Sequence, residues 1–156
     1  MLEFSIRPEE GEADRAFMRG LNARLTSVID APTHSNDSVV AFQERFTASA
    51  WGSDTGESAT FVAIKKDGQR LGYVNVRGSI DEIADERCGY VALLAVVAEA
   101  EGEGVGQSLL RQAEKWTKEM GFRRLSLDVF ASNHRGQRFY EEAGFRPETI
   151  RLVKRL

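Results

Sequence analysis

Apolar and polar residues alternate with two different periods along the chain, and the change of period separates predicted strands from predicted helices. Residues 3–7 alternate apolar with polar side chains, which predicts a short strand. Residues 12–29 instead carry apolar side chains at helical spacing. A second helix is predicted over residues 37–51, with Asp37 or Ser38 as its N-terminal cap.

The second part of the chain repeats this alternation of strands and helices. Residues 59–80 alternate on both sides of an Asp67-Gly68 pair, which predicts a β-hairpin. After a further turn, the near-continuous apolar run 88–98 is typical of a central strand. The remaining predicted elements are a glycine-rich loop, a helix over 105–120, a strand over 124–130, a helix over 132–144 and a last strand over 149–156. This order predicts a layered, mixed α/β fold, with residues 1–156 as one domain.

Composition and charge exclude several classes of protein. The chain of 156 residues has a formal net charge of −3, so its bulk charge does not favour nucleic acid or an anionic membrane as a partner. It contains no apolar stretch of transmembrane length and no signal-peptide pattern, so we expect a cytoplasmic protein. Cys88 is the only cysteine and no metal-ligand spacing is found, so we expect neither a disulfide nor a bound metal.

Three glycines at alternate positions, Gly102, Gly104 and Gly106, stand between a predicted strand and a predicted helix. Free N–H groups and the helix dipole make such a helix start a good phosphate site, and glycine allows the phosphate to approach the backbone. A glycine-rich turn without a ligand is the alternative. The dinucleotide motif fails because Gln107 or Leu109 stands where its third glycine is required, and the P-loop sequence is also absent. A different phosphate carrier is therefore favoured.

Two sequence motifs make the interpretation more specific. The first is the loop Glu101-Gly102-Glu103-Gly104-Val105-Gly106, and the second combines Asn133, Tyr140, Gly144 and Phe145. Together, in this order of strands and helices, they resemble the GNAT superfamily of acyl-CoA-dependent N-acyltransferases, most strongly over residues 60–147. The resemblance implies a mostly antiparallel mixed sheet flanked by helices.

The resemblance also implies acetyl-CoA as cosubstrate. Its pyrophosphate would bind at the start of helix 105–120, and its pantetheine arm would pair with free backbone groups of strand 88–98 as if it were another strand. A backbone N–H near Leu94 would stabilise the oxyanion. The implied cofactor-binding residues are Leu94, Ala95, Val96, Glu101, Gly102, Gly104, Val105, Gly106, Gln107, Asn133, Arg135 and Tyr140.

Two residues are candidates for the proton transfers. The resemblance implies Tyr140 as general acid towards the leaving thiolate, with a packing tyrosine as the alternative. Strand 88–98 has no carboxylate, so Asp128, twelve residues before Tyr140, is the candidate base. By strand alternation Asp128 points away from the face that carries Leu125 and Leu127. A carboxylate that only caps a neighbouring loop remains the alternative for Asp128.

The sequence thus predicts an acetyl-CoA-dependent N-acetyltransferase that moves an acetyl group directly to a primary amine of a small molecule or peptide. A non-catalytic acyl-CoA-binding module is the second interpretation, because Glu101 stands where relatives carry a basic residue. We expect Glu101 and its neighbouring glutamates to point outward, with Arg135, Arg138 and Lys115 compensating their charge. The acceptor amine and the choice between monomer and homodimer stay open.

Overall fold

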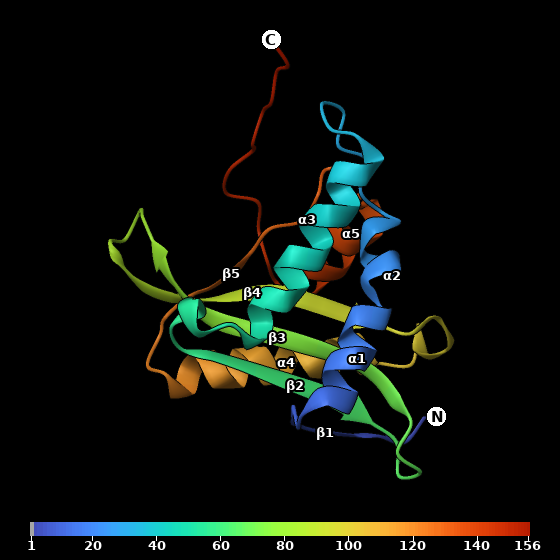
Figure 1. The fold of residues 1–156 in the computed structure, drawn as a ribbon. Helices are drawn as coiled ribbons and strands as arrows, with labels where there is room; N and C mark the ends of the chain where they lie inside the picture. The colour runs from blue at the N-terminus through green and yellow to red at the C-terminus, as the bar shows by residue number, and fades with distance from the viewer. Residues whose placement is uncertain (1) are drawn as a thin grey trace.

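A five-stranded sheet with helices on both faces forms the centre of the molecule (Figure 1). The computed structural model describes residues 2–156. Its strands are β1 (Ser5–Pro8), β2 (Ser58–Ile64), β3 (Arg70–Asp81), β4 (Glu86–Val96) and β5 (Leu125–Leu127). Its α-helices are α1 (Glu12–Gly20), α2 (Asn22–Thr26), α3 (Asn36–Ala48), α4 (Val105–Glu119) and α5 (His134–Glu142), with short 3-10 turns at Ser49–Trp51, Ser53–Thr55 and Ala98–Ala100.

The strands lie in the order β1-β2-β3-β4-β5, antiparallel except for the parallel pair β4–β5. This arrangement confirms the mixed, mostly antiparallel sheet flanked by helices. The predicted hairpin at Asp67-Gly68 is also confirmed. The Lys65 N–H donates to the Gln69 carbonyl at 2.9 Å, and Gly68 takes φ = +92°, a conformation that glycine adopts without a steric penalty.

The two faces of the sheet are covered by different helices (Figure 1). One face packs against α4 through Leu109, Leu110 and Ala113, which are almost wholly buried. The other face meets the N-terminal helices through Met18 and Leu21, which pack on Tyr73 and Val62. Within the described residues, no helix is both long and apolar enough to cross a membrane.

The N-terminal helix is anchored to the sheet by a buried carboxylate. Asp14 of α1 has no exposed side-chain surface and accepts hydrogen bonds from Arg7 Nη1 of β1 at 2.6 Å and from Arg70 Nε of β3 at 2.6 Å. The Glu10 backbone N–H adds a third at 2.7 Å. Although burial alone raises the pKa of a carboxyl, the hydrogen bonds from Arg7 and Arg70 outweigh it and hold the pKa of Asp14 well below its usual range.

The N-terminal helices differ in detail from the sequence predictions. The helix predicted over 12–29 is interrupted at Leu21, so α1 and α2 are separate. Gly20, a poor helix former, stands at this break. The cap of α3 is neither Asp37 nor Ser38. It is Ser35, whose hydroxyl accepts from the Ser38 N–H at 3.1 Å.

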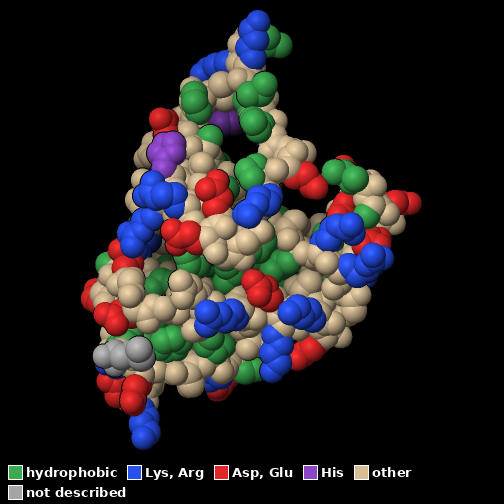
Figure 2. Space-filling model, turned by 180° about the vertical axis from the view of Figure 1, so that it is seen from behind, with side chains coloured by type: hydrophobic (Ala, Val, Ile, Leu, Met, Phe, Trp, Pro, Cys, Tyr) green, Lys and Arg blue, Asp and Glu red, His purple; other side chains and the backbone are tan. Residues whose placement is uncertain are grey.

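The prediction of a last strand over residues 149–156 is wrong. Residues 146–156, here called the C-terminal tail, contain no helix or strand and are all exposed. The tail leaves the body and stands apart from it (Figures 1 and 2). The strand predicted over 124–130 is also shorter than expected, because only Leu125–Leu127 pair with β4.

Candidate active site

The sheet opens between its two parallel strands, β4 and β5. They pair only over Gly89, Tyr90 and Val91 of β4. The register between β3 and β4 then shifts, which leaves Ala92 as an extra residue, or β-bulge. From Leu93 onward, β4 pairs only with β3 within the described residues. The edge of β4 that faces β5 is therefore free of strand pairing beyond the bulge.

The direction of the backbone groups along this free edge follows from the hydrogen-bond alternation of antiparallel strands. The Val97 N–H donates to the Leu71 carbonyl at 2.8 Å. Every second residue before Val97 therefore also points its backbone groups to β3. Ala95, opposite Tyr73 of β3, is one of these residues. Leu94 and Val96 point theirs to the open side. The sequence analysis expected the backbone of Ala95 to bind the cosubstrate. In the structure the N–H and carbonyl groups of Ala95 point to β3 instead.

The glycine loop lies at the start of α4. Gly102 and Gly104 take φ values of +78° and +83°, and Gly104 is the N-terminal cap residue. A Cβ atom on either glycine would meet nothing within 4 Å, so the space in front of the loop is open. Val105 is 1% exposed and anchors the first turn in the core, while a Cβ on Gly106 would lie 3.4 Å from Phe139 of α5. The loop thus presents the free N–H groups of this turn, including that of Gln107, from a fixed position.

Glu101 is exposed, as the sequence predicts, but its charge is not free. Its carboxylate is held by Arg24 of α2 and, at 2.9 Å, by Arg135 Nη1 of α5. The hydrogen bond from Arg135, followed by that from Arg24, lowers the pKa of Glu101. Arg24 Nε also donates to the Val96 carbonyl at 2.8 Å. The predicted compensation by Arg135 is thus found, whereas Lys115 pairs with Glu119 instead.

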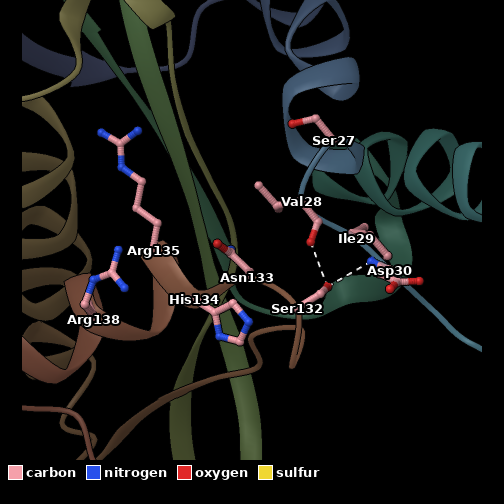
Figure 3. A pocket seen from close by; sticks show the side chains of 9 residues that line it. All are labelled: Ser27, Val28, Ile29, Asp30, Ser132, Asn133, His134, Arg135 and Arg138. Atoms are coloured by element: carbon pink, nitrogen blue, oxygen red, sulfur yellow. Dashed lines mark hydrogen bonds between the residues drawn. The ribbon is translucent and has the colours of Figure 1, made fainter.

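A cavity of about 540 Å³ lies between the loop after α2 and the start of α5 (Figure 3). Ser132 holds the two sides together, because its hydroxyl donates to the Val28 carbonyl at 2.7 Å and accepts from the Asp30 N–H at 2.8 Å. Asn133 caps α5 through the Gly136 N–H at 2.9 Å. The lining residues are Ser27, Val28, Ile29, Asp30, Ser132, Asn133, His134, Arg135 and Arg138, a set with two arginines suited to an anion.

Tyr140 lies in an apolar environment on α5. Its ring packs edge-on against Phe139 and Phe145, with centroid distances of 5.2 and 5.9 Å. Burial raises the pKa of Tyr140 to about 12. No hydrogen-bond partner of its hydroxyl is found within residues 2–156. The phenol is therefore protonated at neutral pH and has no internal acceptor in the described chain.

Asp128 meets a residue that sequence reasoning missed. The hydroxyl of Tyr90 on β4 donates to Asp128 Oδ2 at 2.7 Å. Burial, and then Asp128, raise the pKa of Tyr90 well above its usual range, so this phenol remains a donor. Arg77, the cross-strand neighbour of Tyr90, is held by Asn75 Oδ1 at 2.7 Å. Asp128 thus belongs to a polar row across one face of the sheet.

The structure does not bring Asp128 and Tyr140 into contact. Tyr140 packs against the core cluster that includes α4, whereas Asp128 points to the face with Tyr90. Arg24, Tyr90 and Ser132 are the additional polar residues of the site. Their partners are distant in sequence, 72 residues apart for Arg24 and Val96, so no local spacing could have indicated them.

The comparison with family models decides the family. Residues 24–145 match the model of the acetyltransferase (GNAT) family. The chain belongs to the GNAT family. Acetyl-CoA is the cosubstrate of GNAT acetyltransferases, and the matched range contains the glycine loop, the open edge of β4 and the start of α5.

Individual GNAT relatives fall into different acceptor classes. The chain is 34% identical over 93 residues to a Bacillus subtilis (strain 168) protein assigned as a ribosomal protein bS18-alanine N-acetyltransferase, covering 60% of this chain and 58% of that one. It is 31% identical over 100 residues to the aminoglycoside N(6')-acetyltransferase type 1 of Stenotrophomonas maltophilia, covering 62% and 65%. The matches thus span less than two thirds of either relative.

A solved GNAT-type structure extends the similarity to nearly the whole chain. A Pyrococcus furiosus protein assigned as an acetyl transferase superposes with a TM-score of 0.81 at 26% identity, covering 99% of this chain and 100% of that one. The overall GNAT fold therefore agrees with the family assignment.

Proposed function

We propose that the protein is an acetyl-CoA-dependent N-acetyltransferase that transfers the acetyl group directly to a primary amine of a small molecule or peptide. The observation that carries the proposal is the opening of the sheet after Val91, next to a helix that starts from a glycine loop. An extended arm with amide groups fits the first feature, and a pyrophosphate fits the second.

Backbone groups on one continuous surface would hold the cosubstrate. The pantetheine arm pairs with the outward groups of Leu94 and Val96, and the pyrophosphate lies over the N–H groups that begin at Val105. The Val96 carbonyl already accepts from Arg24, but a carbonyl has two lone pairs and can accept a second donor. The cavity with Arg135 and Arg138 offers cationic groups for further phosphate on the same ligand.

Tyr140 is the residue we assign as proton donor to the leaving thiolate. The amine nitrogen attacks the thioester carbon, the C–S bond breaks, and the Tyr140 hydroxyl proton passes to sulfur. The second proton that the nitrogen must lose to become an amide then restores the Tyr140 hydroxyl. A thiol has an ordinary pKa of about 8.5, well below the value of about 12 for Tyr140. The difference between these two pKa values opposes the proton transfer. Burial also raises the pKa of a thiol in the same apolar environment, so there the difference between the thiol pKa and the Tyr140 pKa is smaller. The Leu94 N–H on the open side is the donor for the oxyanion.

Asp128 is the carboxylate we assign as base. The acceptor arrives as an ammonium and must lose a proton before it attacks. Asp128 and Tyr140 make no contact in the described chain and act on different atoms, Asp128 on the amine nitrogen and Tyr140 on sulfur. Tyr90 donates to one oxygen of Asp128 and leaves Oδ1 for the ammonium or for a water molecule that relays its proton.

A second candidate function is a non-catalytic acyl-CoA-binding module. It is favoured by Glu101, which engages Arg24 and Arg135 beside the phosphate loop and adds a negative charge there. Such a module would bind the cosubstrate and transfer nothing.

Mass spectrometry distinguishes the two candidates. The protein is incubated with acetyl-CoA and a library of amines and of peptides with free N-termini, and acetylated products are counted against a reaction without protein. Acetylated amine together with free CoA supports the transferase. Acetyl-CoA binding in calorimetry without product from any amine would support the module instead.

A further inference from the structure

Arg77 of β3 is a half-buried cation without an acidic partner in residues 2–156. Every other lysine or arginine of the described chain that is not exposed forms a salt bridge with a carboxylate. These residues are Arg7, Arg15, Arg24, Lys65 and Arg70. Burial lowers the pKa of Arg77, which nevertheless stays charged at neutral pH. Because removing a charge from water is costly unless the charge is paired, Arg77 lacks a counter-ion.

Neutral groups hold the guanidinium of Arg77 in a fixed orientation. Asn75 has no exposed surface, and its Oδ1 accepts from Arg77 Nε at 3.0 Å and from Nη2 at 2.7 Å. Asn75 is itself fixed, because its Nδ2 donates to Ser58 Oγ at 3.1 Å and to Thr60 Oγ1 at 2.9 Å. Ser49 Oγ accepts from Nη1 and Nη2 of Arg77, both at 3.2 Å. Within the described chain these bonds leave one Nη1 hydrogen unused and the positive charge uncompensated.

Glu57, at the start of β2, does not balance this charge. Its carboxylate pairs with Arg87 instead. A Cβ added to Gly78 would lie 3.1 Å from Glu57 Oε2, which places this pair on the Gly78 side of β3. Successive residues of a strand point to opposite faces, so Arg77 lies on the other side of the sheet.

Arg77 shares its face of the sheet with Asp128, the proposed base. Arg77 is opposite Tyr90 of β4, and Tyr90 is next to Ser126 of β5. Asp128 follows Ser126 by two residues and accepts from the Tyr90 hydroxyl at 2.7 Å. Adjacent strands lie about 4.8 Å apart, so the backbones of β3 and β5 are separated by about 10 Å. The polar row therefore has a cation at one end, an anion at the other, and Tyr90 between them.

A row of aromatic rings accompanies these polar residues. The Arg77 guanidinium lies 5.5 Å from the ring centroid of Phe46 on α3, and the Phe46 and Phe42 centroids are also 5.5 Å apart. Phe42 meets Phe130 edge-on at 6.3 Å, and Phe130 follows Asp128 by two residues. Although both rings are large and apolar, Phe42 is 36% and Phe130 42% exposed. A short chain of methylene groups between two charged ends would cover these rings and remove them from water.

We propose that the acceptor is an amine that also carries a carboxylate, and that Arg77 binds this carboxylate while Asp128 receives the amine. The inference deepens the proposed transferase function and rests on it for the role of the bound amine as acceptor. The ammonium loses its proton to Asp128, and the carboxylate supplies the anion that Arg77 lacks. Linear amino acids with several methylene groups between amine and carboxylate have this chemistry. Arg77 is thus a residue that determines acceptor specificity.

Paired substrates test the proposal on the wild-type protein. Glycine, γ-aminobutyrate and ε-aminocaproate are each compared with the corresponding amide, which has the same amine and no negative charge. We expect kcat/KM to favour the carboxylate by about 10- to 100-fold for the longer chains, the range of a hydrogen bond to a charged group. Glycine should show little preference, because its two groups are too close together to reach both ends of the polar row.

Variants of Arg77 assign this preference to its charge. Arg77→Gln should abolish the preference, with the larger fall in kcat/KM on the carboxylate substrate. Arg77→Lys keeps the charge and should restore part of the preference. Arg45→Gln is the matched control, because it removes the same charge from an exposed arginine of α3, and it should keep the full preference. Melting temperatures show whether each variant is folded, and the wild-type substrate comparison needs no variant.

A binding measurement separates this inference from the transferase function. Calorimetric titration with ε-aminocaproate should detect binding to the wild-type protein and much weaker binding to Arg77→Gln. Such binding without acetylation of any amine would contradict the transferase function and support the carboxylate site. Acetylation with equal kcat/KM for carboxylates and amides would support the transferase and overturn the carboxylate site. Binding or preference that survives unchanged in Arg77→Gln would also overturn it.

Discussion

At the scale of single residues, the site depends on groups held in unusual surroundings. Tyr140 is a phenol among aromatic rings, without a hydrogen-bond partner in the described chain. Its sequence position within a motif indicated a role, but not that burial raises its pKa to about 12. Asp128 was identified as a strand carboxylate, whereas its partner Tyr90 depends on the β4–β5 register, which no local pattern specifies.

Tyr140→Phe should lower kcat by roughly 10²- to 10⁴-fold, with little change in KM for acetyl-CoA. The ring still packs against Phe139 and Phe145, so what is lost is a proton donor that acts as the C–S bond breaks. Steady-state kinetics with a good acceptor measures both constants. Phe139→Leu is the control for packing, because it disturbs the same cluster and keeps the hydroxyl. Near-normal kcat in Tyr140→Phe would make Tyr140 a packing residue.

At the scale of elements, the sequence predicted most helices and strands correctly, and the largest error, the last strand, has a physical cause. Alternation identified β1, β2 and β3, an apolar run identified β4, and helical spacing identified α4, whereas a cap at Ser132 or Asn133 and the stop at Gly144 indicated α5. Residues 149–156 were also predicted as a strand, yet they pair with no strand of the described chain. A periodic pattern states that a segment can join a sheet, but not which edge it joins.

Gly104→Ala should weaken acetyl-CoA binding, because the added Cβ enters the open space in front of the loop. Gly121→Ala is a matched control at the other end of α4. Its φ of +81° is close to the +83° of Gly104, and a Cβ there also meets nothing within 4 Å. Both variants carry the same backbone strain, so calorimetric titration isolates the effect on the ligand. Equal affinities in the two variants would show that the glycine loop is only a turn.

Asp14→Asn should destabilise the fold by about 3–5 kcal/mol, because Arg7 and Arg70 lose the buried anion between them. The folded pKa of Asp14 lies below its unfolded value, so this contribution is complete above about pH 4. It is lost as pH falls further, towards the folded pKa. Denaturant unfolding between acidic and neutral pH should therefore show a flatter pH dependence for Asp14→Asn. Glu12→Gln, an exposed change on the same helix, should leave the unfolding free energy nearly unchanged.

At the scale of the whole molecule, the N-terminal helices and α5 meet over the edge of the sheet where the cosubstrate is proposed to bind. Arg24 reaches Val96 and Glu101, and Ser132 reaches Val28 and Asp30. A ligand that contacts several of these segments at once binds the folded state and not the unfolded chain. Its binding free energy is therefore added to the stability of the fold.

Acetyl-CoA should accordingly raise the melting temperature, with a stabilisation of about 2.7 kcal/mol at a hundred times its Kd. NADH and ATP at the same concentration should have much smaller effects, because the dinucleotide and P-loop sequences are absent. Differential scanning fluorimetry with all three ligands measures this. Equal shifts for all three, or no shift with acetyl-CoA, would contradict the assignment of the cosubstrate.

The Ser132 bridge has a consequence for how the molecule assembles. Its partner Val28 precedes it by 104 residues, so the two sides of the cavity cannot join until most of the chain has been synthesised. Long-range contacts of this kind close late in folding, because the entropy of a large loop must be overcome first. The N-terminal helices therefore emerge from the ribosome well before the surface that completes the cavity, and the cavity is expected to be among the last parts of the molecule to form.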